Sequence, residues 1–241
     1  MKDFFTGLQF LTRIRVIKQT EWSPESFGRS VKYFTLIGTV IGLILAGLNY
    51  VLSQFFPQHV LAAIIVVAEI VLTGGLHCDG LMDTADGVFS GRSRERMLEI
   101  MKDSRVGANG VVAFGILLLL KYSLIVDMTP TMLPAALVVM PVAGRMAMVI
   151  SITSFPYARP DGMGKAFAQY AGRTTLVIAA VIALLIVASL GIQASVSAGA
   201  AVLMGVLAAR YLTNVLGGLT GDTYGAVTEL TELAALLIFV I

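Results

Sequence analysis

The chain has 241 residues, of which 57% are hydrophobic and 13% are charged, whereas a soluble domain carries roughly 25% charged residues. So little charge excludes a water-soluble globule of this length and favours a lipid bilayer as the solvent. The net charge of +2 gives no basic field for nucleic acid, and the single cysteine, Cys78, excludes an internal disulfide framework.

Seven apolar stretches follow one another along the chain. The hydrocarbon core of a bilayer needs about 20 apolar residues in each helix. The expected spans are residues 33–55, 58–74, 107–126, 132–152, 174–190, 196–216 and 227–241, of which the last is short. We therefore predict an all-α polytopic membrane bundle of about seven transmembrane helices, which forms a single catalytic domain over residues 1–241.

Lysine and arginine concentrate in three segments between these spans. They occur in residues 1–32, which we expect to lie partly in the membrane interface, in residues 75–106 and in residues 153–173. The connections at residues 57–58 and 127–131 carry none. Because basic residues favour the cytoplasmic side, seven spans with a cytoplasmic N-terminus place every basic segment on that side.

An acidic run follows the second span, from Gly74 to Gly87. Within it, Asp79, Asp83 and Asp86 stand at positions i, i+4 and i+7, which share one face of a helix. Three carboxylates on one face repel each other unless a cation lies among them, and such hard oxygen ligands suit Mg²⁺ or Mn²⁺. The alternative is a solvated, acidic helix start, where aspartate is also favourable.

A second acidic loop, residues 217–229, repeats part of this pattern. Both runs begin Gly-Gly-Leu, and in this alignment Asp222 matches Asp79 and Glu229 matches Asp86. We hypothesise that the two loops are halves of one metal site. The middle position is Ala226, so the match is partial, and chance similarity in a chain rich in glycine and leucine is the alternative.

Two basic residues between these loops could neutralise phosphate oxygens. Lys102 and Arg105 are interleaved with acidic and hydroxyl residues and are followed by glycines, whose N–H groups can approach a ligand. Anchoring of the third span on the cytoplasmic side is the alternative. His77, beside the aspartates, is a candidate general base or else a polar helix-end residue.

Four charged residues fall inside expected spans, where such residues usually face a cavity or a partner. Arg145 and Arg210 lie toward the cytoplasmic ends of their spans, so we predict that they bind an anionic substrate. Lys121 lies nearer the outer end of its span, and we expect its side chain to reach out to the membrane interface. Glu69 could pair with either arginine.

The long run GGLHCDGLMDTADGVFSGRSRERMLEIMKDSRVGANG resembles the signature of the cobalamin synthase family, the adenosylcobinamide-GDP ribazoletransferases. The resemblance extends, in order, to LQFLTRI near the N-terminus, to GMGKAF at residues 162–167 and to GGLTGDTYGAVTELTE near the end. It thus covers nearly the whole chain. One departure is Cys78, where an apolar residue such as leucine is expected.

The resemblance implies a Mg²⁺-dependent enzyme of the inner membrane, with its active site facing the cytoplasm. Such enzymes join adenosylcobinamide-GDP to α-ribazole, or to its 5′-phosphate, and release GMP. The predicted metal ligands are Asp79, Asp83, Asp86, Asp222 and Glu229, with Asp86 or His77 accepting the hydroxyl proton and Lys102 and Arg105 holding phosphates. Membrane lipid is an expected partner and nucleic acid is not, while the oligomeric state, including a homo-oligomer, is left open.

Two other classes of protein share some of these features. CDP-alcohol phosphotransferases also place spaced aspartates at a membrane, but their pattern has Ala-Arg after Asp-Gly, which this chain lacks. A transporter would use intramembrane charges and a two-loop repeat as a substrate path. The acidic residues here cluster at one face rather than at mid-depth, which disfavours transport.

Overall fold

The computed structural model describes residues 2–18 and 23–241, and the named elements within them are all helical. These residues form twelve α-helices and one 3₁₀ turn and contain no named strand. The predicted all-α class is confirmed. Residues 1 and 19–22 of the predicted N-terminal segment lie outside the described part.

The elements follow one another with short connections. They are α1 (Lys2–Leu11), α2 (Pro24–Ser30), the 3₁₀ turn η1 (Val31–Tyr33), α3 (Phe34–Leu52), α4 (Gln58–Thr73), α5 (Leu76–Val88), α6 (Arg94–Ile100), α7 (Ala108–Asp127), α8 (Leu133–Ser154), α9 (Met163–Tyr170), α10 (Arg173–Ser189), α11 (Ile192–Leu216) and α12 (Gly221–Val240).

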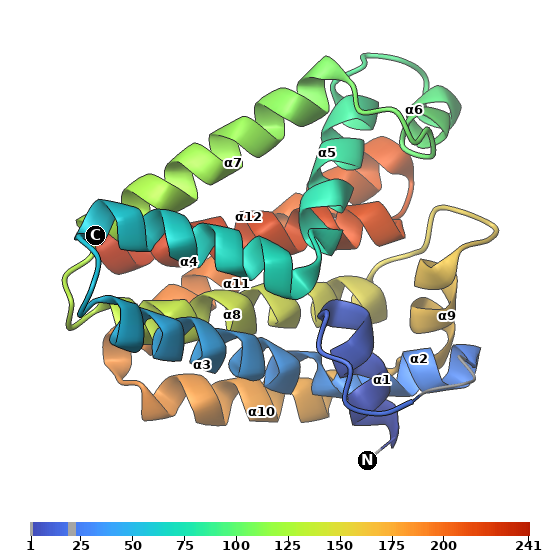
Figure 1. Cartoon of the computed structure of the whole chain (residues 1–241). Helices are drawn as coiled ribbons and strands as arrows, with labels where there is room; N and C mark the ends of the chain where they lie inside the picture. Colours follow the sequence, from blue (N-terminus) through green and yellow to red (C-terminus); the bar gives the residue numbers. More distant parts are fainter. Residues whose placement is uncertain (1, 19–22) are drawn as a thin grey trace.

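The long helices are apolar enough to cross a membrane. Five stretches in the described chain qualify alone: the continuous stretch Pro24–Leu52, and helices α7, α8, α11 and α12. Two further pairs are bent, α4 with α5 by 90° and α9 with α10 by 97°, so the count rises to seven if each pair is one span. Figure 1 shows α4 and α10 running along the bundle, whereas α5 and α9 run across one end of it. We therefore treat α5 as lying outside the spans, and the prediction of about seven membrane helices is confirmed.

Helix α8 forms the centre of the bundle and is almost entirely buried. Helix α3 packs closely against it because Gly38 and Gly42 face it without side chains. A Cβ at Gly38 would lie 2.5 Å from the carbonyl oxygen of Pro141, and one at Gly42 would lie 2.6 Å from the Cα of Val138. Small residues that let backbones approach are the usual basis of helix packing in membranes, where lipid offers no hydrophobic drive.

The basic segments gather at one end of the bundle, as the charge pattern predicts. Helices α1, α2, α6 and α9 lie at this end in Figure 1, while the C-terminus and the α3–α4 and α7–α8 connections lie at the other. One boundary differs from expectation. Of the acidic loop 217–229, all but the first four residues belong to α12, because Thr220 and Thr223 cap each other and start the helix at Gly221.

Candidate active site

Both Gly-Gly-Leu motifs form turns that end a helix. Helix α4 is followed by Gly74 (φ 67°) and Gly75 (φ 69°), and α11 is followed by Gly217 (φ 70°). Glycine adopts these left-handed conformations at little cost, which is why it commonly ends helices. The first turn swings α5 across the end of the bundle, and the second returns the chain into α12.

Helix α5 crosses the start of α12 at very close range. A Cβ at Gly80 would lie 2.5 Å from the carbonyl oxygen of Asp222, and one at Gly225 would lie 3.1 Å from the Cα of His77. The two acidic segments that the sequence analysis paired are therefore adjacent in space. Glycines on both helices make this crossing possible.

Three aspartates meet at this crossing. Asp79 is exposed, Asp83 is half-buried and the Asp222 side chain is 24% exposed. Burial, and then the negative charges of Asp79 and Asp222, raise the pKa of Asp83 to about 7. A divalent cation among these oxygens would relieve the repulsion, and carboxylate oxygens are ligands that Mg²⁺ prefers. The ligand atoms of the three aspartates do not all lie within 4.8 Å of one another.

Arg159 belongs to this site, although the sequence analysis did not single it out. Its guanidinium lies 2.8 Å from a carboxylate oxygen of Asp222, and only 11% of its side chain is exposed. The residues before Arg159 pair with the second glycine turn through two backbone hydrogen bonds. The N–H of Ala158 donates to the carbonyl of Leu219 at 2.8 Å, and the N–H of Leu219 donates to the carbonyl of Pro156 at 2.8 Å. Nothing in the sequence distinguishes Arg159 from the other basic loop residues.

Asp86, which the sequence suggests as metal ligand and general base, turns toward the start of α7. Its two carboxylate oxygens accept hydrogen bonds from the N–H groups of Gly107, at 2.7 Å, and Gly110, at 2.8 Å. A carboxylate is stabilised at a helix N-terminus by these free N–H groups. The contacts of Asp86 therefore favour a positioning role over the two predicted roles.

The predicted phosphate-binding residues lie on the exposed side of the α6–α7 connection. Arg105 pairs with Asp103 at 2.7 Å, and these hydrogen bonds lower the pKa of Asp103 to about 2. Arg105 also borders a polar cavity of about 280 Å³ beside Asp86. Lys102 is exposed, as is Arg210 on α11. Their roles toward the substrate stay predictions.

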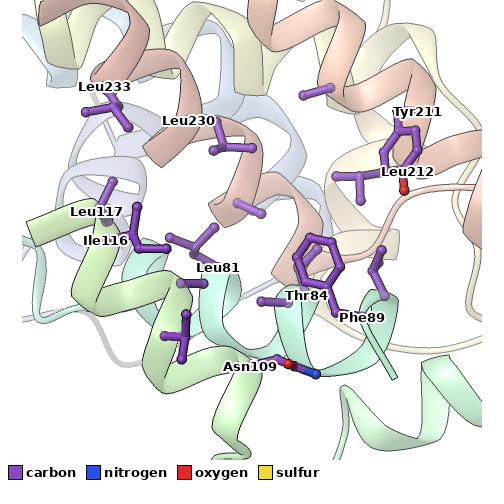
Figure 2. Close-up of a pocket in the computed structure, with 16 residues that line it drawn as sticks. Leu81, Thr84, Phe89, Asn109, Ile116, Leu117, Tyr211, Leu212, Leu230 and Leu233 are labelled. Carbon is purple, nitrogen blue, oxygen red and sulfur yellow. The ribbon is translucent and has the colours of Figure 1, made fainter. Parts of the chain in front are cut away.

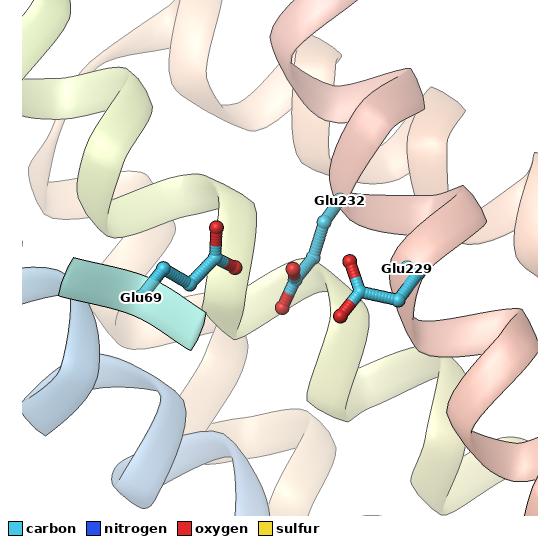
Figure 3. A group of neighbouring side chains, drawn as sticks. All are labelled: Glu69, Glu229 and Glu232. Carbon is cyan, nitrogen blue, oxygen red and sulfur yellow. The ribbon is translucent and has the colours of Figure 1, made fainter. Parts of the chain in front are cut away.

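A separate group of charges lies buried inside the bundle. Figure 3 shows the carboxylates of Glu69 on α4 and of Glu229 and Glu232 on α12 pointing toward one another. Among the described residues, this is the only set of three acidic, histidine or cysteine side chains with ligand atoms all within 4.8 Å. The ammonium of Lys121 on α7 donates to all three, at 3.0 and 3.1 Å to Glu69 and at 2.8 Å to each of the others.

These contacts correct three expectations, because in an apolar interior opposite charges must find each other. Glu229 binds the ammonium of Lys121 instead of joining the aspartates as a metal ligand. Lys121 is 2% exposed and does not reach out to the interface. Glu69 pairs with Lys121 rather than with an arginine. Lys121 and, at Glu232, Arg145 supply positive charge to these carboxylates.

Arg145 and His77 extend this buried group toward α5. Arg145 is fully buried and pairs with Glu232, which argues against its predicted contact with substrate. Its second nitrogen lies 3.3 Å from Nδ1 of His77, which is 2% exposed. The enclosure of His77 argues against a general base that must reach a substrate.

An apolar cavity of about 360 Å³ opens between α5, α7, α11 and α12 (Figure 2). Large side chains on its wall are exposed, among them Phe89 at 69%, Ile116 at 52% and Tyr211 at 56%. Helices α7, α11 and α12 cross the membrane, so hydrocarbon would cover the part of this surface that they form. We assign it no substrate.

The crossing of α5 and α12 makes a specific prediction about Gly80. Alanine at this position would force the α5 backbone away from Asp222, and a displacement of about 1 Å can lower catalysis roughly 10²-fold. We expect Gly80→Ala to lower kcat by that order. Gly115→Ala on α7, where a Cβ would meet no atom within 4 Å, is the matched control. Equal rates for the two variants would mean that the close crossing is unimportant.

The fold and the site together define a multi-pass helical membrane protein with an acidic centre at one end of its bundle. More particularly, the chain belongs to the cobalamin-5-phosphate synthase family, whose model matches residues 3–240. This confirms the resemblance seen in the sequence.

Curated relatives in several bacteria carry the name adenosylcobinamide-GDP ribazoletransferase. That of Acetivibrio thermocellus is 39% identical, over 99% of this chain and 97% of its own length. Those of Roseiflexus sp. and Desulforamulus reducens are 43% and 42% identical, over 95% and 86% of this chain and 86% and 84% of their own lengths. No solved structure is significantly similar.

Proposed function

We propose that this chain is a membrane ribazoletransferase that joins adenosylcobinamide-GDP to α-ribazole, or to its 5′-phosphate. The products are adenosylcobalamin, or its 5′-phosphate, and GMP. Family membership supports this substrate class. The observation that carries the proposal is the meeting of Asp79, Asp83 and Asp222 where α5 crosses α12, because phosphoryl transfer from an anionic diphosphate needs a centre that can hold cations.

In the proposed reaction, a ribose hydroxyl attacks the phosphorus attached to the cobinamide arm. A new P–O bond forms, the bond from that phosphorus to the bridging oxygen of the diphosphate breaks, and GMP leaves with the electron pair. The hydroxyl proton passes to a base or to water. Bound Mg²⁺ would neutralise charge on the leaving phosphate.

The chain's own residues have separate tasks in this scheme. Asp79, Asp83 and Asp222 would hold the metal, and Arg159 keeps the Asp222 carboxylate in place. Asp86 fixes α7 to α5 and thereby keeps the aspartate helix in position. Each of these tasks depends on side chains brought together at the same end of the bundle.

We further propose that this end of the bundle faces the cytoplasm and that the protein resides in the inner membrane. The grouping of the basic segments at that end supports the orientation, because lysine and arginine are enriched in cytoplasmic loops. A cytoplasmic site would also meet soluble nucleotide-linked substrates.

Product analysis with and without metal tests this function. Protein purified in detergent should release GMP and form adenosylcobalamin from adenosylcobinamide-GDP and α-ribazole. EDTA should abolish both products, and added Mg²⁺ should restore them, because the aspartate oxygens are hard ligands. Undiminished turnover in EDTA would exclude the metal centre. Release of CMP from a CDP-alcohol, without activity on the corrinoid, would instead identify the rival class of enzyme.

A further inference from the structure

A second cavity, of about 450 Å³, adjoins the aspartates. It lies between the segment that follows α1 and the turn that joins α4 to α5. The charged residues on its wall are Arg13, Arg15 and Asp79. The cavity therefore has positive charge on one side and a proposed metal ligand on the other.

Arg13 is held firmly against the first glycine turn. The backbone N–H of Arg13 donates to the carbonyl of Leu72 at 2.7 Å, and its guanidinium donates to the carbonyl of Gly74 at 3.4 Å. A Cβ at Gly74 would coincide with this guanidinium. Gly74 therefore both ends α4 and makes room for Arg13 beside the site.

Arg15 is carried by the same ordered segment. The side-chain oxygen of Gln9 accepts hydrogen bonds from the N–H groups of Val16, at 3.2 Å, and Ile17, at 3.0 Å. The hydroxyl of Thr12 accepts one from the N–H of Ile14, at 3.1 Å. Backbone on both sides of Arg15 is thus fixed, so binding a ligand would cost little ordering of this segment.

Neither arginine has a carboxylate partner among the described residues. Only some of the other arginines at this end of the bundle do: Arg96 pairs with Glu99, Arg105 with Asp103 and Arg159 with Asp222. Two unpaired guanidinium groups beside a cavity favour an anion with several oxygens. A diphosphate meets this requirement better than a single phosphate, because it offers one anionic group to each arginine and leaves further non-bridging oxygens, whose charge a cation held by Asp79 would neutralise.

We propose that Arg13 and Arg15 bind the diphosphate of the nucleotide-linked donor, in the cavity next to Asp79. This inference rests on the proposed function and assigns the donor's diphosphate to a particular place. It also makes Arg105 dispensable for that contact, since Arg105 already binds Asp103.

Steady-state kinetics with α-ribazole as acceptor, which carries no phosphate, test the proposal. Charge-assisted hydrogen bonds contribute enough that Arg13→Ala and Arg15→Ala should each raise KM for adenosylcobinamide-GDP roughly tenfold to hundredfold. The KM for α-ribazole should stay unchanged. Arg92→Ala, an exposed arginine of the α5–α6 connection, is the matched control and should leave both constants as they are.

Equilibrium binding separates this proposal from the proposed function. With Mg²⁺ present, both variants should bind GDP at least tenfold more weakly than the wild type and bind guanosine equally well. Arg15→Ala decides the matter if Arg13→Ala does not fold. Wild-type affinity for GDP and an unchanged donor KM in Arg15→Ala would overturn the proposal. A higher KM for α-ribazole 5′-phosphate, with an unchanged KM for the donor, would also overturn the proposal. It would place the phosphate of the acceptor, rather than the diphosphate of the donor, beside the two arginines. If the wild type releases no GMP, the proposed function fails, and GDP binding still tests the arginines.

Discussion

Asp83→Asn should lower kcat by roughly 10³-fold or more while the protein still inserts into membranes and is extracted normally. The charges of both Asp79 and Asp222 act on Asp83, so we expect Asp83 to be the oxygen donor on which the proposed metal site depends most. A bound metal supplies several kcal/mol of transition-state stabilisation, and each 1.36 kcal/mol is a factor of ten in rate. Release of GMP by protein purified in detergent, over a range of Mg²⁺ concentrations, measures the effect.

Asp127→Asn is the matched control for this variant. Asp127 is exposed at the opposite end of the bundle, where α7 ends, so the same change of charge there should leave the rate within about twofold of the wild type. A wild-type rate in Asp83→Asn would remove the centre of the proposed mechanism. A loss of rate that high Mg²⁺ partly restores would support a direct metal contact.

Of the substitutions proposed for this protein, Lys121→Met should lower the free energy of unfolding the most. Removing this ammonium leaves Glu69, Glu229 and Glu232 facing one another in the interior of the bundle, with only Arg145 to balance them. Breaking a buried ion pair by deleting one partner costs about 3–5 kcal/mol. We expect the thermal unfolding temperature in detergent to fall by roughly 10 °C or more.

A second substitution distinguishes the loss of the ammonium from a general loss of packing. The carboxylate of Glu69 accepts hydrogen bonds from the Lys121 ammonium, at 3.0 and 3.1 Å. Adding Glu69→Gln to Lys121→Met should therefore recover part of the lost stability, since it removes one uncompensated charge. Lys2→Met, at an exposed position of α1, should have little effect. An unfolding temperature for Lys121→Met equal to that of the wild type would contradict the account.

The architecture could be predicted from the sequence because lipid imposes strong local rules. Apolar stretches of about 20 residues predict membrane helices. The distribution of lysine and arginine predicts which connections lie together at one end of the bundle. The spacing of Asp79 and Asp83 placed both on one face of α5. The repeated Gly-Gly-Leu motif indicated that Asp222 belongs beside them, and the glycine contact at Gly80 brings them together.

Only the tertiary structure decided which charged groups pair with each other. Helical spacing fixes the face on which a side chain lies but not the helix that packs against that face. Glu229 and Asp86 therefore matched the acidic pattern in sequence, yet one binds Lys121 in the interior and the other binds the start of α7. Arg13 and Arg159 read as ordinary basic residues, and only folding brings them to the aspartates from distant parts of the chain. Pairing of buried charges depends on distances across the bundle, and these are set by packing rather than by local sequence.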